Sequence, residues 1–105
     1  MNFLEIHNEA KEAAKKGSEQ YIEKYGEQFY PCGFAWVIIH VDGRSPLGKE
    51  VRKVCEKNIM GKGYMVWNPS NHSTQNMDVK YSGALEYALV LQKHGIACSA
   101  NARMD

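Results

Sequence analysis

The chain has 105 residues, a hydrophobic share of 44% and a formal net charge of +1. This length fits one domain spanning residues 1–105, in which we expect residues 1–26 to form an N-terminal helix and residues 30–105 a sheet-and-helix core. The nearly balanced charge argues against a nucleic-acid partner, which usually requires a strongly basic domain. The N-terminus lacks a signal-peptide pattern and no apolar run is long enough to span a bilayer, so we expect a soluble cytoplasmic protein with no membrane partner.

The cysteines and histidines show no metal-binding spacing. There is no Cys-x-x-Cys pair and no His-Glu-x-x-His motif among Cys32, Cys55, Cys98, His7, His40, His72 and His94. An odd number of cysteines without such spacing is typical of reduced, structural thiols. We therefore expect no metal site and no cofactor.

Residues 3–25 have the pattern of an amphipathic helix, because apolar residues recur at steps of three and four. The middle of its apolar stripe is thin, with Ala10, Ala13, Ala14 and Gly17. A partner surface fits closely against such a stripe, so docking of another protein there is one hypothesis. Gly17 weakens a helix by about 1 kcal/mol relative to alanine, and a break near residues 17–18 is the alternative.

Two apolar segments, residues 33–39 and 64–67, predict strands. Both faces of the first are apolar, which is typical of a central strand covered on both sides. Between them, Ser45 is placed to cap a helix that begins at Pro46 and runs to about Asn58.

A third helix is expected from about Asp78 to Gly95, followed by a short third strand at residues 96–100. The order α-β-α-β-α-β favours parallel pairing through right-handed crossovers. We therefore predict an α/β fold with a small, three-stranded, mainly parallel sheet. The direction of the third strand is left open.

Most of the distinctive polar residues follow the predicted strands. Parallel strands bring their carboxyl ends to one rim of the sheet, where open α/β sheets bind ligands. Long polar loops such as residues 68–76 are often functional, although loops are polar in any protein and a structural role fits the same residues. We expect ligand contacts from Arg44, Ser45, Lys49, Trp67, Asn68, Asn71, His72, Ser73 and Arg103.

Two features of this rim suit an anionic ligand that contains a ring. The helix that Ser45 begins has free amides beside Arg44 and Lys49, which suit a phosphate or carboxylate, although capping alone explains Ser45. Trp67, at a strand end, offers a face for stacking a nucleobase, a contact of about 1 to 3 kcal/mol. Trp36 lies inside its strand and is expected in the core.

An enzyme is the alternative hypothesis. His40 or His72 would act as the general base of a small hydrolase, with Asp42 orienting His40. This reaction requires the histidines to line one concave site. The sequence supplies no recognisable nucleophile for it.

The segments Tyr30-Pro31-Cys32-Gly33-Phe34-Ala35-Trp36-Val37, Trp67-Asn68-Pro69 and Gln75-Asn76-Met77-Asp78 resemble those of a group of short uncharacterised proteins encoded by tailed bacteriophages. The resemblance covers the chain from about Tyr30 onward. It implies a viral protein that acts in the host bacterial cytoplasm, and it carries no catalytic residues to transfer.

These observations predict a small accessory binding protein. Its polar loops would contact an anionic small molecule such as a nucleotide, or a host protein. Small domains bury a limited fraction of their surface, so we also expect a homodimer.

Overall fold

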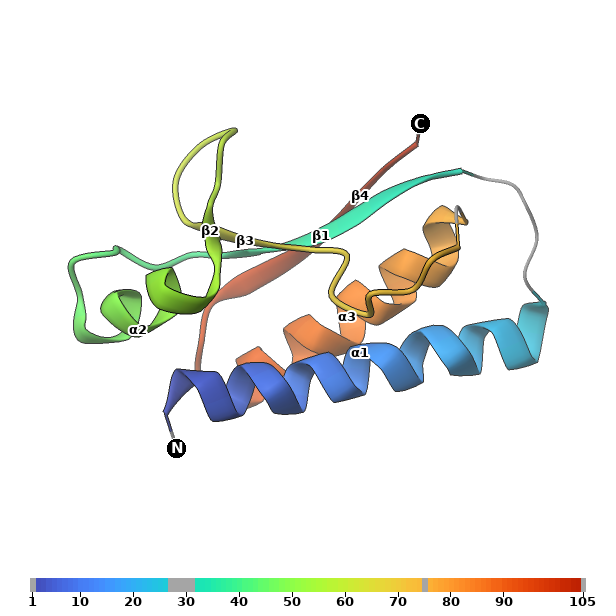
Figure 1. Cartoon of the computed structure of the whole chain (residues 1–105), viewed down its shortest axis with the longest axis horizontal. Helices are drawn as coiled ribbons and strands as arrows, with labels where there is room; N and C mark the ends of the chain where they lie inside the picture. Colours follow the sequence, from blue (N-terminus) through green and yellow to red (C-terminus); the bar gives the residue numbers. More distant parts are fainter. Residues whose placement is uncertain (1, 27–31, 75, 105) are drawn as a thin grey trace.

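The computed structural model describes residues 2–26, 32–74 and 76–104. Three helices and four strands occur in these ranges (Figure 1). In chain order they are α1 (Phe3–Tyr25), β1 (Gly33–Ile39), α2 (Pro46–Val54), β2 (Glu56–Lys57), β3 (Tyr64–Trp67), α3 (Met77–Lys93) and β4 (Cys98–Met104).

The four strands form one sheet in the order β2-β3-β1-β4, and every neighbouring pair is antiparallel. The fold is therefore α+β, and the predicted three-stranded, mainly parallel α/β sheet is wrong. The third predicted strand corresponds to β4, which pairs antiparallel with β1 from Gly33 opposite Met104 to Ile39 opposite Cys98. From β1 onward the chain follows the β-α-β-β-α-β order of the split βαβ motif, with α1 placed before it.

The short β2 explains the error in strand direction. The helix predicted to reach Asn58 ends at Val54, and the chain then forms a two-residue strand that turns back into β3. Asn58 holds this turn, because its backbone amide donates to the Gly63 carbonyl at 3.0 Å and its side-chain amide to the Lys62 carbonyl at 3.0 Å. Gly63 has a φ of 93°, and a Cβ there would lie 2.5 Å from the Ile39 carbonyl oxygen, so the turn requires glycine.

The helices cover one face of the sheet (Figure 1). α3 packs against β1 and β4, and α1 packs along α3. Side chains of β1 alternate between the two faces, so Ala35, Val37 and Ile39 face the helices and are almost fully buried. The core comprises Phe3, Ile6, Ala10, Ala14, Ala35, Val37, Ile39, Val51, Ala84, Tyr87, Ala88, Leu91 and Ile96.

α1 is continuous through Gly17, as the apolar pattern predicted, and the alternative of a break near residues 17–18 does not occur. Its thin stripe lies against α3, where a Cβ at Gly17 would approach Glu86 Cγ at 2.6 Å and the Ser82 carbonyl oxygen at 3.1 Å. The hypothesis that this stripe docks a separate protein is therefore wrong, because α3 already occupies it.

A second close contact occurs at Gly83 of α3. A Cβ at this position would lie 2.7 Å from Ser18 Oγ, 2.7 Å from Ser70 Cβ and 3.0 Å from the Ala14 carbonyl oxygen. Gly83 is thus the point at which α1, α3 and the loop after β3 meet.

No helix in the described part of the chain combines the length and the apolar character needed to cross a membrane.

Candidate functional site

The antiparallel register separates the predicted site residues into two groups. Ile39 lies opposite Tyr64, so the end of β1 is beside the beginning of β3. The carboxyl ends of β3 and β4 lie toward the other end of the sheet. Arg44, Ser45 and Lys49 follow the end of β1, whereas the opposite group contains Trp67, Asn68, Asn71, His72, Ser73 and Arg103. The predicted common rim is therefore wrong.

The group after β1 is occupied mainly by local contacts. Ser45 caps α2, since its Oγ accepts from the Gly48 amide at 3.0 Å and donates to the Asp42 carbonyl at 2.7 Å. Arg44 donates to both carboxylate oxygens of Asp42, at 3.2 and 3.1 Å, and these bonds lower the pKa of Asp42. Lys49 is exposed. Capping and this surface ion pair account for Ser45 and Asp42 without a ligand.

The loop after β3 is held by its own polar groups. Asn68 and Asn71 adopt positive φ angles of 43° and 53°, a conformation that asparagine tolerates better than most residues. The Asn68 side-chain amide donates to the His72 carbonyl at 3.1 Å, and the backbone amide of Thr74 donates to His72 Nδ1 at 3.1 Å. Ser73 is exposed. These bonds fix the loop and use the Nδ1 lone pair of His72, which weakens the case for this histidine as a general base.

His40 and Asp42 do not form the predicted pair. His40 Nε2 lies 3.1 Å from Ser99 Oγ, on the strand opposite, while Asp42 is bonded to Arg44. His72 follows β3 at the other end of the sheet. The two histidines therefore do not share one concave site.

Aromatic rings gather on the face of the sheet opposite the helices, which we call the open face. The rings of Trp36 and Trp67 stack with centroids 5.6 Å apart and an interplanar angle of 14°, and the Phe34 ring lies 5.6 Å from that of Trp67. Phe34, Trp36 and Trp67 form what we call the aromatic cluster. Trp67 remains 52% exposed and Phe34 38% exposed, whereas Trp36 is 8% exposed. The cluster thus presents ring surface to solvent, supported by a buried ring.

Cationic and polar groups border the aromatic cluster. Arg103 of β4 lies directly opposite Phe34 and is exposed. Lys80 Nζ lies 5.5 Å from the centre of the Phe34 ring and donates to the Gly33 carbonyl at 3.0 Å. Asn101 lies opposite Trp36, two register positions further along and on the same face of the sheet. Ring faces, a guanidinium and a side-chain amide are therefore adjacent.

The Trp36 indole N–H has no hydrogen-bond partner among the described residues, although it is fully buried. Buried tryptophan N–H groups usually find an acceptor, and an unpaired buried donor costs about 1 to 3 kcal/mol. The sheet therefore bears a local energetic cost at the aromatic cluster.

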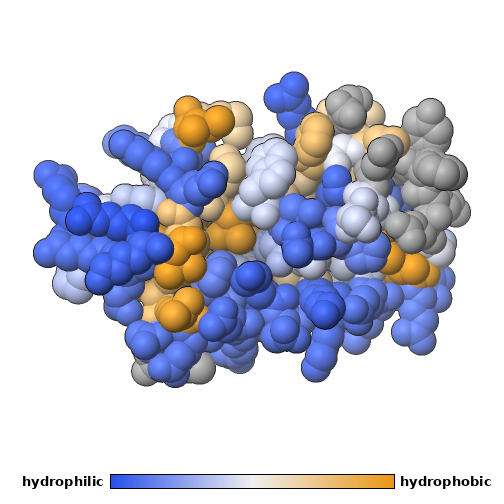
Figure 2. Space-filling view, viewed as in Figure 1, coloured by the Kyte–Doolittle hydropathy of each residue, from blue (hydrophilic) through white to orange (hydrophobic). Residues whose placement is uncertain are grey.

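A second candidate site, which we call the basic pocket, lies where β1 ends. It has a volume of about 660 Å³, and its charged or titratable lining residues are His40, Asp42, Arg44, Arg52, Lys57 and Lys62. Hydrophilic side chains dominate the end of the molecule over α2 and the loop before it (Figure 2). Among described residues, the side chains of Arg52, Lys57 and Lys62 form no ion pair. The pocket is therefore positively charged and open to an anion.

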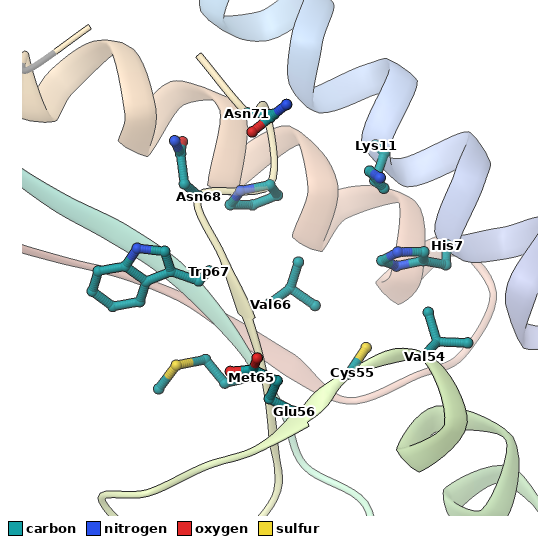
Figure 3. A pocket seen from close by; sticks show the side chains of 11 residues that line it. His7, Lys11, Val54, Cys55, Glu56, Met65, Val66, Trp67, Asn68 and Asn71 are labelled. Carbon is teal, nitrogen blue, oxygen red and sulfur yellow. The ribbon is translucent and has the colours of Figure 1, made fainter. Parts of the chain in front are cut away.

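A third cavity, of about 490 Å³, lies between α1, the end of α2 and β3 (Figure 3). Three residues of the predicted set line it, Trp67, Asn68 and Asn71, together with His7, Lys11 and Cys55 (Figure 3). His7 Nδ1 is 2.6 Å from the hydroxyl of buried Tyr87. The position of His7 on the apolar stripe of the first helix is the sequence signal for this buried role, which was not predicted.

Burial favours the neutral forms of His7 and Cys55, which line this cavity, and of Tyr87 behind His7. Burial, followed by the nearby charge of Lys11, lowers the pKa of His7. Burial raises the pKa of the Cys55 thiol to about 12, and it also raises the pKa of Tyr87. A thiol with such a pKa is not a thiolate at neutral pH, so the cavity lacks an activated cysteine nucleophile.

Residues 2–26, 32–74 and 76–104 contain no group of three His, Cys, Asp or Glu side chains that could hold a metal ion. A scan against protein-family models, a search of curated proteins and a search of solved structures each found no match. The resemblance to tailed-phage proteins stays a prediction.

Proposed function

We propose that this protein is a binding protein for nucleotide-like ligands, whose base stacks on the aromatic cluster of the open face. The observation that carries the proposal is the exposed Trp67 ring, stacked on Trp36 and next to Phe34, on the face that the helices leave free. Aromatic side chains stack on nucleobases of any sequence, because every base has a π face.

The surroundings of the cluster favour a ligand that has both a ring and a negative charge. Arg103 lies opposite Phe34, and Asn101 opposite Trp36 can offer hydrogen bonds to a base edge. Four-stranded sheets with aromatic residues on one open face are a known means of binding unpaired bases, and this likeness is an analogy of architecture only. The proposal keeps Trp67 and Arg103 from the predicted set and moves the site from the loops to the sheet.

An NMR titration with adenosine and thymidine monophosphates tests the proposal by following the backbone amides of β1, β3 and β4. We expect shifts around Trp67, and we expect Trp67→Ala to weaken binding by about 5- to 150-fold, equivalent to about 1 to 3 kcal/mol. Leu89→Ala is the matched control, because Leu89 is 56% exposed on α3, in the helix layer. Equal affinities for the wild type and Trp67→Ala would contradict the proposal.

The hydrolase alternative receives less support from the geometry. His40 and His72 lie at different ends of the sheet, and Cys55 is a neutral thiol. A host protein as ligand, a homodimer and a phage origin remain predictions. Chemical crosslinking and sedimentation of the purified protein would test the dimer directly.

A further inference from the structure

The aromatic cluster and the basic pocket lie along one strand. Phe34 is near the start of β1, and His40, which lines the pocket, directly follows its last residue. Six residue steps of about 3.3 Å separate them by about 20 Å. A mononucleotide does not span this distance, whereas a short single strand does.

Polar side chains of β4 connect the two sites along the open face. Arg103, Asn101 and Ser99 lie opposite Phe34, Trp36 and Ile38 in turn. Ser99 Oγ is 3.1 Å from His40 Nε2, so this row of hydrogen-bonding groups reaches the edge of the basic pocket. The row follows the path that a strand of nucleic acid would take between the two sites.

The charge of the chain is unevenly distributed. Residues 40–65 contain six Lys or Arg and three Asp or Glu, although the whole chain has a net charge of only +1. Arg52, Lys57 and Lys62 project their charge into one pocket with no acidic partner among the described residues. The low net charge, which alone argues against a nucleic-acid partner, therefore conceals a local cationic site.

We infer that the physiological ligand is single-stranded nucleic acid, with bases stacked on the aromatic cluster and backbone phosphates in the basic pocket. This inference rests on the proposed function and specifies its ligand class. Duplexes are excluded because their bases are already stacked and offer no ring face to Trp67. The span fits a site of about four to six nucleotides, at the small end of single-strand sites.

The test measures fluorescence anisotropy with labelled oligothymidylate and oligouridylate of about eight nucleotides, in competition with thymidine monophosphate and with a duplex. We expect either oligonucleotide to bind at least about 100-fold more tightly than the monophosphate. Arg103 and the three unpaired pocket cations predict a slope of about −3 for log affinity against log salt. The two oligonucleotides distinguish DNA from RNA, and tight binding of either supports the inference.

Two triple variants that remove the same number of positive charges distinguish a specific effect of the basic pocket from a general effect of lowering the net charge. Arg52→Gln/Lys57→Gln/Lys62→Gln should weaken oligonucleotide binding at least about tenfold and reduce the salt slope to about −1. Lys15→Gln/Lys16→Gln/Lys24→Gln removes three exposed lysines of α1 and should leave both values unchanged.

The possible failures are distinguishable. The single-strand inference would be overturned, and the proposed base stacking left intact, by any of three results. These are equal affinity for the monophosphate and the oligonucleotide, equal competition by the duplex, or an oligonucleotide affinity that the Arg52→Gln/Lys57→Gln/Lys62→Gln variant does not change. Absence of binding by both oligonucleotides and the monophosphate would overturn both. Oligonucleotide binding that is insensitive to Trp67→Ala would also overturn both, because the aromatic cluster would then take no part.

Discussion

The two faces of the sheet differ in what their side chains do, although the same strands supply both. On the covered face, Ala35, Val37 and Ile39 are at most 1% exposed and pack against the helices. On the open face, Phe34 and Trp67 leave 38% and 52% of their surface in contact with solvent. Burial of aliphatic groups stabilises the fold, whereas exposed aromatic rings contribute less to folding and are available for binding. The covered side of β1 thus stabilises the fold, and the open side carries the proposed binding surface.

The largest expected effect comes from breaking the covered face. Tyr87 of α3 is 0% exposed, and Tyr87→Ala should lower the free energy of unfolding by about 3 to 5 kcal/mol. Trp67→Ala on the open face should lower it by only about 1 kcal/mol, since half of that ring is already in water. Urea denaturation of both variants measures the difference, and equal losses would contradict the division between the faces.

A second substitution tests the contact between the two long helices. At Gly17, the backbone of α3 and the Glu86 side chain leave no room for a side chain. Gly17→Leu should therefore lower the free energy of unfolding by about 1 to 3 kcal/mol. Glu19→Leu adds the same side chain at an exposed position of α1 and serves as the control. An unaltered unfolding midpoint for Gly17→Leu would show that the helices separate there.

Ser45 and Ser73 were both predicted to contact a ligand, and they follow strands that end at opposite ends of the sheet. Their substitution by alanine compares the structural roles of the two loops. Ser45→Ala should cost about 1 kcal/mol, because it removes the cap of α2. Ser73→Ala, at an exposed position in the loop after β3, should leave the free energy of unfolding within about 0.5 kcal/mol of the wild type. Thermal unfolding of the two variants provides the measurement, and a larger loss for Ser73→Ala would assign that serine an unrecognised role.

The smallest expected effect is a pH dependence from the covered side. Burial and Lys11 lower the pKa of His7 below its ordinary value of 6.5, so the unfolded chain binds a proton that the folded protein excludes. Stability from this group is fully present above that ordinary value and is lost as the pH falls from it toward the folded pKa. Denaturation midpoints from neutral pH to about pH 5 should show the decrease. His7→Asn should abolish this component and Lys11→Gln should reduce it; an undiminished decrease in His7→Asn would assign it to another group.

Local elements were predictable because their signals are local. The stripe from Phe3 to Tyr25, the Ser45-Pro46 helix start and the apolar residues of β1 each predicted the correct element, with ends within a few residues. Strand direction was not predictable in the same way. Glu56 and Lys57 form β2 without any apolar alternation, so the reversal that makes the sheet antiparallel leaves no pattern in the sequence.

The candidate site was predicted only in part for a related reason. The apolar residues Phe34, Trp36 and Ile38 suggested that a second layer of helices covers β1. Apolar alternation along a strand does not show whether an aromatic ring packs against a helix or stacks on another ring. Trp67 was identified because it ends a predicted strand and Arg103 because it follows one, whereas Arg103 lies within β4. Their position next to Phe34 required the register. The pocket cations Arg52, Lys57 and Lys62 look like ordinary surface residues until the hairpin brings them together.

The meeting point at Gly83 couples the packing of the helix layer to the loop that follows β3. Because α1, α3 and Ser70 touch there with no space for a methyl group, a shift of either helix displaces the segment that follows Trp67. Gly83 therefore ties the packing of the two long helices to the position of the loop after β3. Substitutions that enlarge Ala14 or Ser18 would therefore change the position of the loop after Trp67 without touching the aromatic cluster.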